Sequence, residues 1–357
     1  MNYYGLMSIN KTVFLGMSGG VDSSLSASLL LGQGYNVVGV YMKNWTKDIP
    51  GFDCPWKEDY QDAKRVAVKL GMDFRVFDFE KQYKQKVVDY MIDEYKAGRT
   101  PNPDIMCNQE VKFKLFLDTA LEQGADLIAT GHYARTKDGK LLKATDGNKD
   151  QTYFLYRVSE DALKKTLFPI GEFKTKDAVR KEAKKRGIET AEKEDSQGIC
   201  FVGKVGIREF LSQYVKTAPG LIKDENGVEV GTHDGAIFYT IGQRHGLNVG
   251  GGLPYYVTGK DMKTNIVYVT TNLSDPNLWS KAITLTDVHL INSTDLSKAK
   301  NLQARTRHRA PLVNVTDIEL VKNQLKIQLK DEIRALTPGQ STVIYSGDQV
   351  LGGGIVI

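Results

Sequence analysis

The chain has 357 residues, of which 41% are hydrophobic and 25% are charged, and its formal net charge is +5. This composition is typical of a water-soluble globular protein, and no apolar run approaches the length of a membrane span. The length predicts two or three domains and excludes a small disulfide-stapled fold.

The N-terminal stretch MNYYGLMSINKTVFLG has neither a basic start with a long apolar run nor a small-residue cleavage site. The chain contains three cysteines, an odd number that argues against a disulfide framework. We therefore expect a cytoplasmic protein without a signal peptide and without a membrane partner. Basic residues gather at 180–187 and 304–310, which suits a polyanionic partner.

Between Thr12 and about Thr130, short apolar runs alternate with amphipathic segments. The pattern predicts strands at 12–17, 36–42, 74–79 and 126–130, and helices at 22–34, 58–71 and 112–124. Gly71 supplies a left-handed stop for the second helix. This βαβα order predicts a doubly wound parallel sheet, with ligands bound at the carboxyl ends of its strands.

The string SGGVDSS, residues 18–24, lies at the first strand-to-helix junction. Gly19 and Gly20 let the backbone approach an anion closely, and the helix that begins near Val21 points its free amides at the same place. No Gly-Lys-Ser/Thr follows and no third glycine is present, so the loop is neither a Walker A motif nor a dinucleotide fingerprint. The sequence predicts a phosphate-binding loop.

The second half of the chain changes in character. A hairpin turns at Asp138 and Gly139, and a basic helix follows from about Lys176 to Arg186. Beyond Pro219 the signals are strands punctuated by glycine. We predict an α/β domain at 1–209, a small central linking domain at 210–273, and a C-terminal β-barrel at 274–357.

The cysteines differ in their surroundings. Cys54 lies beside Trp56 and fits a packing role. Cys107 lies on a proline-stiffened loop that opens a helix, so we expect the helix amides to lower its pKa. Cys200 lies on a glycine-containing loop, too far along the chain from Cys107 for a local CxxC motif. No spacing of histidine and cysteine predicts a metal site.

The SGGVDSS loop resembles the pyrophosphate loop of the ATP pyrophosphatases, which use ATP to adenylate an oxygen. The whole chain resembles the bacterial and mitochondrial tRNA-specific 2-thiouridylases, with the motifs in the family's order. The motifs that carry this resemblance are GMSGGVDSS, YMKNW, EYKAGRTPNPDIMCNQEVKF, ATGHYA, NKDQTYFLY, LFPIGEFKT, DSQGICF, IGQRHGL and LTPGQS. The resemblance implies that 1–209 is an adenine nucleotide alpha hydrolase-like ATP pyrophosphatase catalytic domain, and that the central domain at 210–273 binds tRNA or links the other two.

It also implies a tRNA-uridine 2-sulfurtransferase that thiolates the wobble uridine of Lys, Glu and Gln tRNAs, releasing AMP and pyrophosphate. ATP with Mg²⁺ is the implied cosubstrate, with Asp22 near the metal ion. A sulfur-relay protein or cysteine desulfurase is the implied persulfide donor. The implied ATP-binding residues are Gly16, Met17, Ser18, Gly19, Gly20, Val21, Asp22, Ser23, Met42 and Gly131.

Further roles carry over from the same resemblance. Cys200 would receive the persulfide, and Cys107 would either form a disulfide with Cys200 or liberate hydrosulfide. Asp104 would be the acid or base beside the uracil ring. The target-base residues would be Asn102, Pro103 and Asp104. The tRNA-binding residues would be His132, Lys149, Asp150, Gln151, Arg307, His308 and Gln340.

One departure concerns residues 307–310, which read Arg-His-Arg-Ala where the family often shows Arg-Tyr-Arg-Gln. Three alternatives stay open on sequence alone. A ligase of the same superfamily, which adenylates a small carboxylate or carbonyl, would need neither Cys107 nor Cys200. A nucleotide-sensing RNA-binding module would leave the cysteine motifs without a purpose. A variant with an iron–sulfur cluster would have at most three cysteine ligands.

Overall fold

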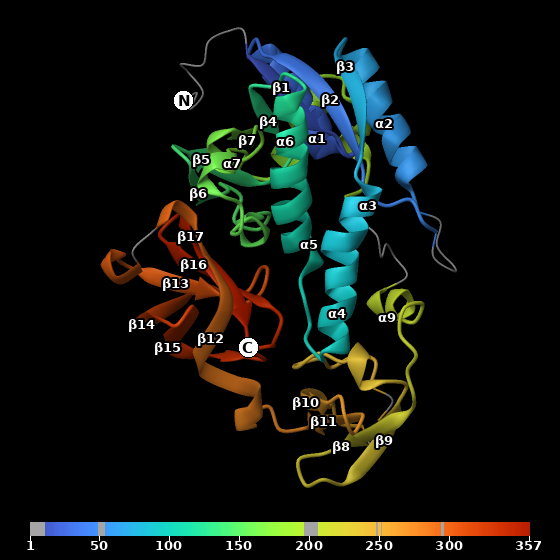
Figure 1. The fold of residues 1–357 in the computed structure, drawn as a ribbon, viewed down its shortest axis with the longest axis vertical. Coiled ribbons are helices and arrows are strands. Elements are labelled where there is room, and N and C mark those ends of the chain that lie inside the picture. Colours follow the sequence, from blue (N-terminus) through green and yellow to red (C-terminus); the bar gives the residue numbers. More distant parts are fainter. Residues whose placement is uncertain (1–10, 49–53, 196–205, 248, 251, 294–295) are drawn as a thin grey trace.

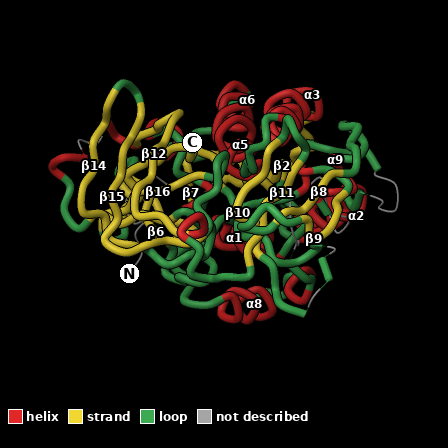
Figure 2. Tube along the Cα trace, turned by 90° about the horizontal axis from the view of Figure 1, so that it is seen from below, coloured by secondary structure: helices red, strands yellow, loops and turns green. Residues whose placement is uncertain are grey.

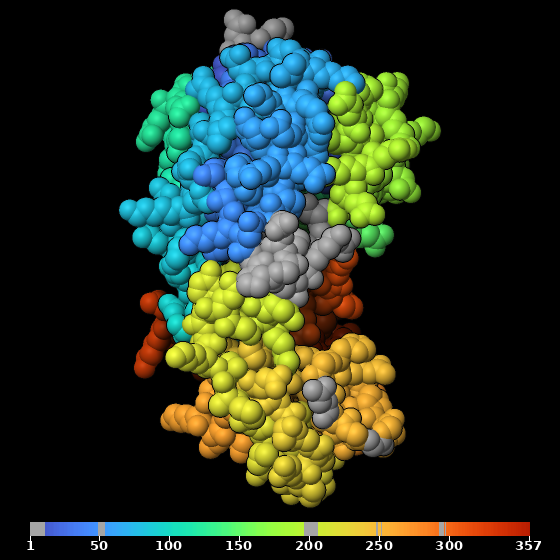
Figure 3. Space-filling view, turned by 90° about the vertical axis from the view of Figure 1, so that its right-hand side faces the viewer, coloured from blue at the N-terminus to red at the C-terminus, as the bar shows by residue number. Residues whose placement is uncertain are grey.

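The computed structural model describes residues 11–48, 54–195, 206–247, 249–250, 252–293 and 296–357. It contains three sheets, arranged as a catalytic region, a central region and a barrel (Figure 1). The catalytic sheet and the central sheet lie at opposite ends of the long axis (Figure 1), and the residues of the two regions occupy opposite ends of the surface in Figure 3. Within the described ranges, no helix combines the length and the apolar character needed to cross a membrane.

The catalytic region is built on a five-stranded parallel sheet, which confirms the predicted doubly wound architecture. Its order is β3-β2-β1-β4-β7, and every neighbouring pair is parallel. The strands are β1 (Thr12–Gly16), β2 (Asn36–Lys43), β3 (Asp73–Asp78), β4 (Leu127–Ala129) and β7 (Thr166–Leu167).

Helices cover both faces of this sheet (Figure 2). Val13 and Leu15 of β1 pack in the same cluster as residues of α1 (Val21–Gly32) and α2 (Trp56–Lys69). Phe14, between them, packs on the opposite face. That face is covered by α3 (Glu80–Tyr83), π-helix η1 (Lys84–Asp89), α4 (Tyr90–Lys96), α5 (Pro103–Met106), π-helix η2 (Cys107–Leu115) and α6 (Phe116–Glu122).

The rest of the catalytic region follows β4. The predicted hairpin is present as β5 and β6, with Asp138 and Gly139 at positive φ in its turn. The predicted basic helix is α8, which lies on the face of α1 (Figure 2). The elements here are β5 (Ala134–Lys137), β6 (Lys140–Lys143), η3 (Thr152–Phe154), α7 (Glu160–Lys164), α8 (Lys176–Lys185) and η4 (Glu189–Glu192).

The central region holds a four-stranded sheet of order β10-β11-β8-β9, in which β8 and β11 are parallel. Its elements are α9 (Ile207–Leu211), β8 (Gly220–Lys223), β9 (Glu229–His233), η5 (Ala236–Phe238), β10 (Tyr256–Asp261) and β11 (Ile266–Thr270).

The C-terminal strands close into a barrel, as predicted, because β12 pairs with both β15 and β17. Hairpin β5–β6 extends the same sheet, with Leu141 opposite Val350. The barrel elements are η6 (Pro276–Leu278), β12 (Trp279–Leu290), η7 (Ile291–Ser293), η8 (Leu296–Lys298), β13 (Leu302–Arg305), β14 (Val313–Val321), β15 (Gln324–Arg334), β16 (Ser341–Ser346) and β17 (Gln349–Val356).

Candidate active site at the carboxyl end of the parallel sheet

The segment between β1 and α1 is a tight backbone loop. Gly19 has a φ of +74°, and a Cβ atom there would lie 2.4 Å from the carbonyl oxygen of Asp59, so only glycine fits. Ser23 Oγ donates to the carbonyl of Gly20 (3.1 Å) and accepts from the amide of Ser18 (3.2 Å). This bonding holds the loop against the first turn of α1, whose unpaired amides are free to bind an anion.

Two further glycines bring the ends of neighbouring strands against this loop. A Cβ atom on Gly16, the last residue of β1, would lie 2.9 Å from Cε of Met42 near the end of β2. A Cβ atom on Gly131, just beyond β4, would lie 2.8 Å from the backbone nitrogen of Ser23. The strand order reverses between β1 and β4, which is where doubly wound sheets bind their ligands.

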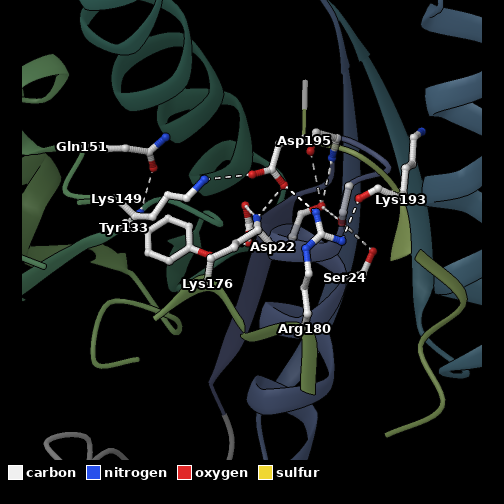
Figure 4. A network of polar contacts seen from close by, with 12 residues as sticks. Asp22, Ser24, Tyr133, Lys149, Gln151, Lys176, Arg180, Lys193 and Asp195 are labelled. Carbon is white, nitrogen blue, oxygen red and sulfur yellow. Dashed lines mark hydrogen bonds and ion pairs between the residues drawn. The ribbon is translucent and has the colours of Figure 1, made fainter. Parts of the chain in front are cut away.

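Asp22, in the first turn of α1, belongs to a network of charged side chains (Figure 4). Its carboxylate accepts from the hydroxyl of Tyr133 (2.9 Å) and from Lys176 Nζ, which lies 2.8 Å from both oxygens. Burial and the charge of Asp22 raise the pKa of Tyr133, so its hydroxyl stays protonated and donates. Lys176 was not predicted from the sequence, because it lies 154 residues from Asp22 along the chain.

Asp195 is the second acidic centre of this network (Figure 4). Its oxygens lie 2.8 Å from Lys176 Nζ and 3.0 Å from both Lys149 Nζ and Arg180 Nη2. Burial opposes its ionisation, but hydrogen bonds from Lys176 and Lys149 outweigh burial and lower the pKa of Asp195. The ionised Asp195 therefore stabilises the folded protein fully at pH values above the pKa that this residue has in the unfolded chain. This stabilisation is lost as the pH falls through the pKa of Asp195 in the folded protein. Cys200, further along the chain, lies outside the described residues.

The predicted target-base segment leads into α5. Asn102 has extended dihedral angles, and Pro103 occupies the first helical position, where a missing N–H leaves no bond unmade. Asp104 is half-buried, and burial raises the pKa of its carboxyl group. Oδ1 of Asn102 is buried and has no hydrogen-bond partner in the described part of the chain. Such an acceptor is suited to a donor on a ligand.

Cys107 lies one turn beyond Asp104, so the two side chains share one face of the helix. Cys107 is only 7% exposed. Burial raises the pKa of the Cys107 thiol, although the charge of Lys112 acts in the opposite direction. The predicted lowering of this pKa is wrong for the present structure. The helix begins at Pro103, so Cys107 is past the first turn, where the free amides no longer reach it.

Lys112 was not singled out from the sequence, but its charge acts on three of the predicted site residues. It lies in π-helix η2, five residues after Cys107, and its side chain is half-buried. Its positive charge acts on Asp104, Cys107 and His132. Across the ranges that the structure describes, no carboxylate forms an ion pair with it. The one signal in the sequence was its position five residues after Cys107. Five residues is the hydrogen-bond spacing of a π-helix, and π-helical turns are frequent at functional sites.

The turn after β4 joins the phosphate loop to helix η2. His132 Nδ1 lies 2.8 Å from Thr130 Oγ1, and the imidazole ring packs against Phe113 and Phe168 with centroids 5.7 and 6.3 Å away. Burial lowers the pKa of His132, so the ring is neutral at pH 7. Gly131 touches the loop and His132 touches η2, so the two parts of the site lie side by side.

Comparison with known proteins assigns the chain to a family. The domain family described as "tRNA methyl transferase HUP domain" matches residues 11–204, its PRC-barrel domain matches 208–271, and an "Aminomethyltransferase beta-barrel domain" matches 280–356. A tRNA-specific 2-thiouridylase of Bacillus licheniformis is 48% identical over 352 residues, which cover 96% of this chain and 94% of that protein. The chain belongs to the tRNA-specific 2-thiouridylase family.

A second 2-thiouridylase, from Geobacillus kaustophilus, is 47% identical over 349 residues, covering 96% of this chain and 94% of that protein. A solved 4-thiouridine synthetase–RNA complex with bound ATP is much less similar. Its TM-score is 0.40 at 20% identity, over 57% of this chain and 50% of that chain.

In this member of the 2-thiouridylase family, the predicted tRNA contacts beyond His132 lie in two places. Lys149 and Gln151 lie in the network around Asp22 and Tyr133 (Figure 4), where Gln151 Oε1 accepts from the amide of Tyr133 (2.8 Å). Asp150 is 2% exposed and pairs with Arg305 of β13 at 3.2 Å. Asp150 therefore links the catalytic region to the barrel, and its contact with tRNA stays a prediction.

Arg307, His308 and Gln340 form the second group, where the barrel meets the other two regions. The His308 ring lies 4.4 Å from the ring of Phe154, and burial lowers its pKa, so it is neutral at pH 7. The side chains of Arg307 and Gln340 donate to backbone carbonyls elsewhere in the protein, including that of Thr100. The RNA contacts of this group also stay predictions.

Lys112→Met is expected to slow the alkylation of Cys107 by iodoacetamide roughly threefold or more. The substitution removes a nearby positive charge, which raises the pKa of the thiol and lowers its thiolate fraction. Because the thiolate is the reactive form, the rate should rise with pH in both proteins. Peptide mass spectrometry gives the rate for each cysteine. Lys114→Met, which changes an exposed lysine in η2, is the control; equal rates in all three proteins would contradict this prediction.

Proposed function

We propose that this chain is an ATP-dependent tRNA-uridine 2-sulfurtransferase that thiolates the wobble uridine of Lys, Glu and Gln tRNAs. The observation that carries the proposal is the turn after β4. Gly131 touches the phosphate loop, and His132 packs on the helix that begins with Cys107. This turn therefore connects the phosphate loop with the helix that carries Cys107, which supports adenylation and sulfur transfer in one site.

The phosphates of ATP would bind to the backbone of residues 16–23, with the ligand extending toward Met42 and Gly131. Mg²⁺ keeps several waters and substrate phosphates as ligands, so it needs few carboxylates from the protein. Asp22 fits this role, because its carboxylate lies at the loop and its side chain is 29% exposed. The metal ion would supply positive charge to the phosphates. Lys176, 2.8 Å from Asp22, would bring a second positive charge to the same place.

The C2 oxygen of uracil is a poor leaving group until it is adenylated. Its attack on the α-phosphorus of ATP releases pyrophosphate and makes AMP the leaving group. The base would be everted from the anticodon stack to reach the site, at a cost of a few kcal/mol. The buried Oδ1 of Asn102 suits the N3–H donor of uracil, and Asp104 would exchange a proton with the base from the same segment.

Sulfur would arrive as a persulfide on Cys200, loaded by a sulfur-relay protein or a cysteine desulfurase. In one route the terminal sulfur attacks C2 and AMP leaves, after which the Cys107 thiolate attacks Cys200 Sγ. A Cys107–Cys200 disulfide forms, and the sulfur remains on C2. In the other route Cys107 first displaces hydrosulfide from the persulfide, and hydrosulfide attacks C2. Both routes need both thiols and leave a disulfide that an external reductant must reopen.

We also propose that the chain divides into a catalytic domain at 1–209, a central domain at 210–273 and a barrel domain at 274–357. The three separate sheets support this division. Hairpin β5–β6 crosses it, because it pairs with the barrel strand β17. The central and barrel domains are the regions proposed to hold the tRNA.

The proposed function predicts 2-thiouridine when the protein is incubated with tRNA, MgATP, cysteine and a cysteine desulfurase. Nucleoside mass spectrometry should find the product in Lys, Glu and Gln tRNAs and none in a tRNA without a wobble uridine. AMP and pyrophosphate should form in equal amounts with the product. The ligase alternative would be favoured if the protein formed no 2-thiouridine with tRNA but consumed ATP when a small carboxylate replaced the tRNA.

A further inference from the structure

Lys176 is held between two carboxylates beside the phosphate loop (Figure 4). Its Nζ lies 2.8 Å from both oxygens of Asp22 and 2.8 Å from Oδ1 of Asp195. Its side chain is only 12% exposed, and the amine lies 5.6 Å from the centre of the Tyr133 ring. Lys176 is also the first residue of α8, where the helix dipole disfavours a positive charge. The two carboxylates, and not the helix, therefore stabilise the ammonium group in this place.

Asp195 is fixed by contacts that do not involve Lys176. Arg180, one turn further along α8, places Nη2 3.0 Å from Oδ1 of Asp195, and Lys149 Nζ lies 3.0 Å from Oδ2. Nη1 of Arg180 donates to the carbonyls of Ala191 (2.7 Å) and Lys193 (2.9 Å). The guanidinium therefore binds the backbone and the carboxylate of one segment at once, through donors that lie in a fixed plane. This anchoring gives Asp195 a position of its own, to which Lys176 can be held.

The segment that carries Asp195 is also tied to α2, which touches the phosphate loop. Lys193 Nζ lies 2.8 Å from Oδ1 of Asp59 and 2.6 Å from Oδ2 of Asp62, and both acids belong to α2. The contact of α2 with the loop is close, because a Cβ atom on Gly19 would overlap the carbonyl oxygen of Asp59. Residues 193–195 therefore connect α2 to α8 through ion pairs at both ends.

We propose that Asp195 is a positioning residue for ATP, which holds Lys176 Nζ beside the phosphate loop so that its positive charge meets the phosphates. This inference rests on the proposed adenylation reaction, in which Asp22 serves the metal ion. A lysine side chain has many rotamers, and a charge stabilises a transition state best where it is held in place in advance. Asp195 provides that hold through an anchor that is independent of Asp22.

Asp195→Asn tests this, because asparagine keeps the shape of the side chain and removes its charge. The reaction measured is a single turnover of tRNA-dependent pyrophosphate release, with saturating ATP and no sulfur donor, so that sulfur transfer does not contribute. We expect its rate constant to fall about 10- to 100-fold, as misplacement of a catalytic group does. Lys176→Met should lose at least as much, and the double variant should be no slower than Lys176→Met alone. Glu192→Gln, which removes an exposed carboxylate from the same segment, is the matched control and should leave the rate constant unchanged.

A second measurement needs neither ATP nor tRNA. In the free protein, Lys176 should react faster with acetic anhydride after Asp195→Asn, because its amine loses a charged partner, and peptide mass spectrometry gives the rate for each lysine. If Asp195→Asn does not fold, Asp195→Glu keeps the charge but moves it by one methylene group. That variant should slow pyrophosphate release by a smaller factor, and a wild-type rate in it would contradict the proposal.

Three further results would overturn the proposal. Unchanged pyrophosphate release by folded Asp195→Asn is the first. Faster release or tighter ATP binding is the second, because Asp195 would then compete with the phosphates for Lys176. Losses that add in the double variant are the third, because Asp195 would then act through the fold and not through Lys176. If the wild type releases no pyrophosphate with tRNA, the proposed function fails, whereas unchanged acetylation of Lys176 in Asp195→Asn shows that Asp195 does not hold it.

Discussion

Replacing Cys107 or Cys200 with serine should lower 2-thiouridine formation at least ~10³-fold, as loss of a covalent nucleophile does. Serine keeps the shape of the side chain but is not deprotonated near neutral pH and cannot carry a sulfane sulfur. The two variants should fail at different steps. Cys107→Ser should still accept sulfur on Cys200 and still release pyrophosphate. Cys200→Ser should lose sulfur loading as well as product.

Cys54→Ser is the matched control for these variants. Cys54 is half-buried, its Sγ lies 3.6 Å from the carbonyl of Trp45, and burial raises its pKa. It is therefore a neutral packing residue at pH 7, and its replacement should cost about 1 kcal/mol and leave turnover near normal. Intact-protein mass spectrometry measures the added sulfur, and nucleoside analysis measures the product. Wild-type thiolation by either Cys107→Ser or Cys200→Ser would rule out the proposed sulfur transfer.

Asp22→Ala and Ser18→Ala should each lower pyrophosphate release at least ~10²-fold while the protein remains folded. Asp22 is the carboxylate at the phosphate loop, and the Ser18 hydroxyl, which alanine removes, lies 3.4 Å from Ser23 Oγ in the same loop. Neither residue is in the hydrophobic core, since Ser18 is exposed and Asp22 is partly exposed. Lys176 keeps Asp195 as a partner when Asp22 is removed.

The measurement for these loop variants is tRNA-dependent pyrophosphate release, with circular dichroism and thermal unfolding as checks of the fold. Asp93→Ala is the control, because Asp93 is an exposed acidic residue in α4, outside the phosphate loop. Pyrophosphate release at the wild-type rate by both folded loop variants would be incompatible with adenylation at this loop.

The sequence alone was enough to predict four of the five strands of the catalytic sheet, because their signals are local, whereas the two-residue strand β7 was not predicted. The continuous apolar run of β1 reflects a strand buried on both faces, and Gly71 ends α2 with a φ of +68° as expected. The phosphate loop was predicted for the same reason, since glycines next to a helix start act within a few residues. The helical run at 80–96 was not predicted, although its buried positions recur at helical spacing from Tyr83 to Tyr95.

The chemical state of the site residues was decided by tertiary structure. The opening of a helix predicted a lowered pKa for Cys107, but packing in the largest core cluster removes water and raises that pKa. The same packing positions Lys112 so that its charge acts on Asp104 and Cys107. Desolvation depends on all the segments that cover a group, and no local pattern in the sequence records it.

The long-range contacts were likewise decided only by the fold. Lys176 reaches Asp22 across 154 residues, and Gln340 reaches Thr100 across 240. The motifs around these residues were visible in the sequence, but their partners were not. A side-chain amide that donates to two carbonyls has no periodicity and no preferred spacing. Such contacts exist only once the barrel has closed and docked, because that docking brings residues 335–340 against the base segment.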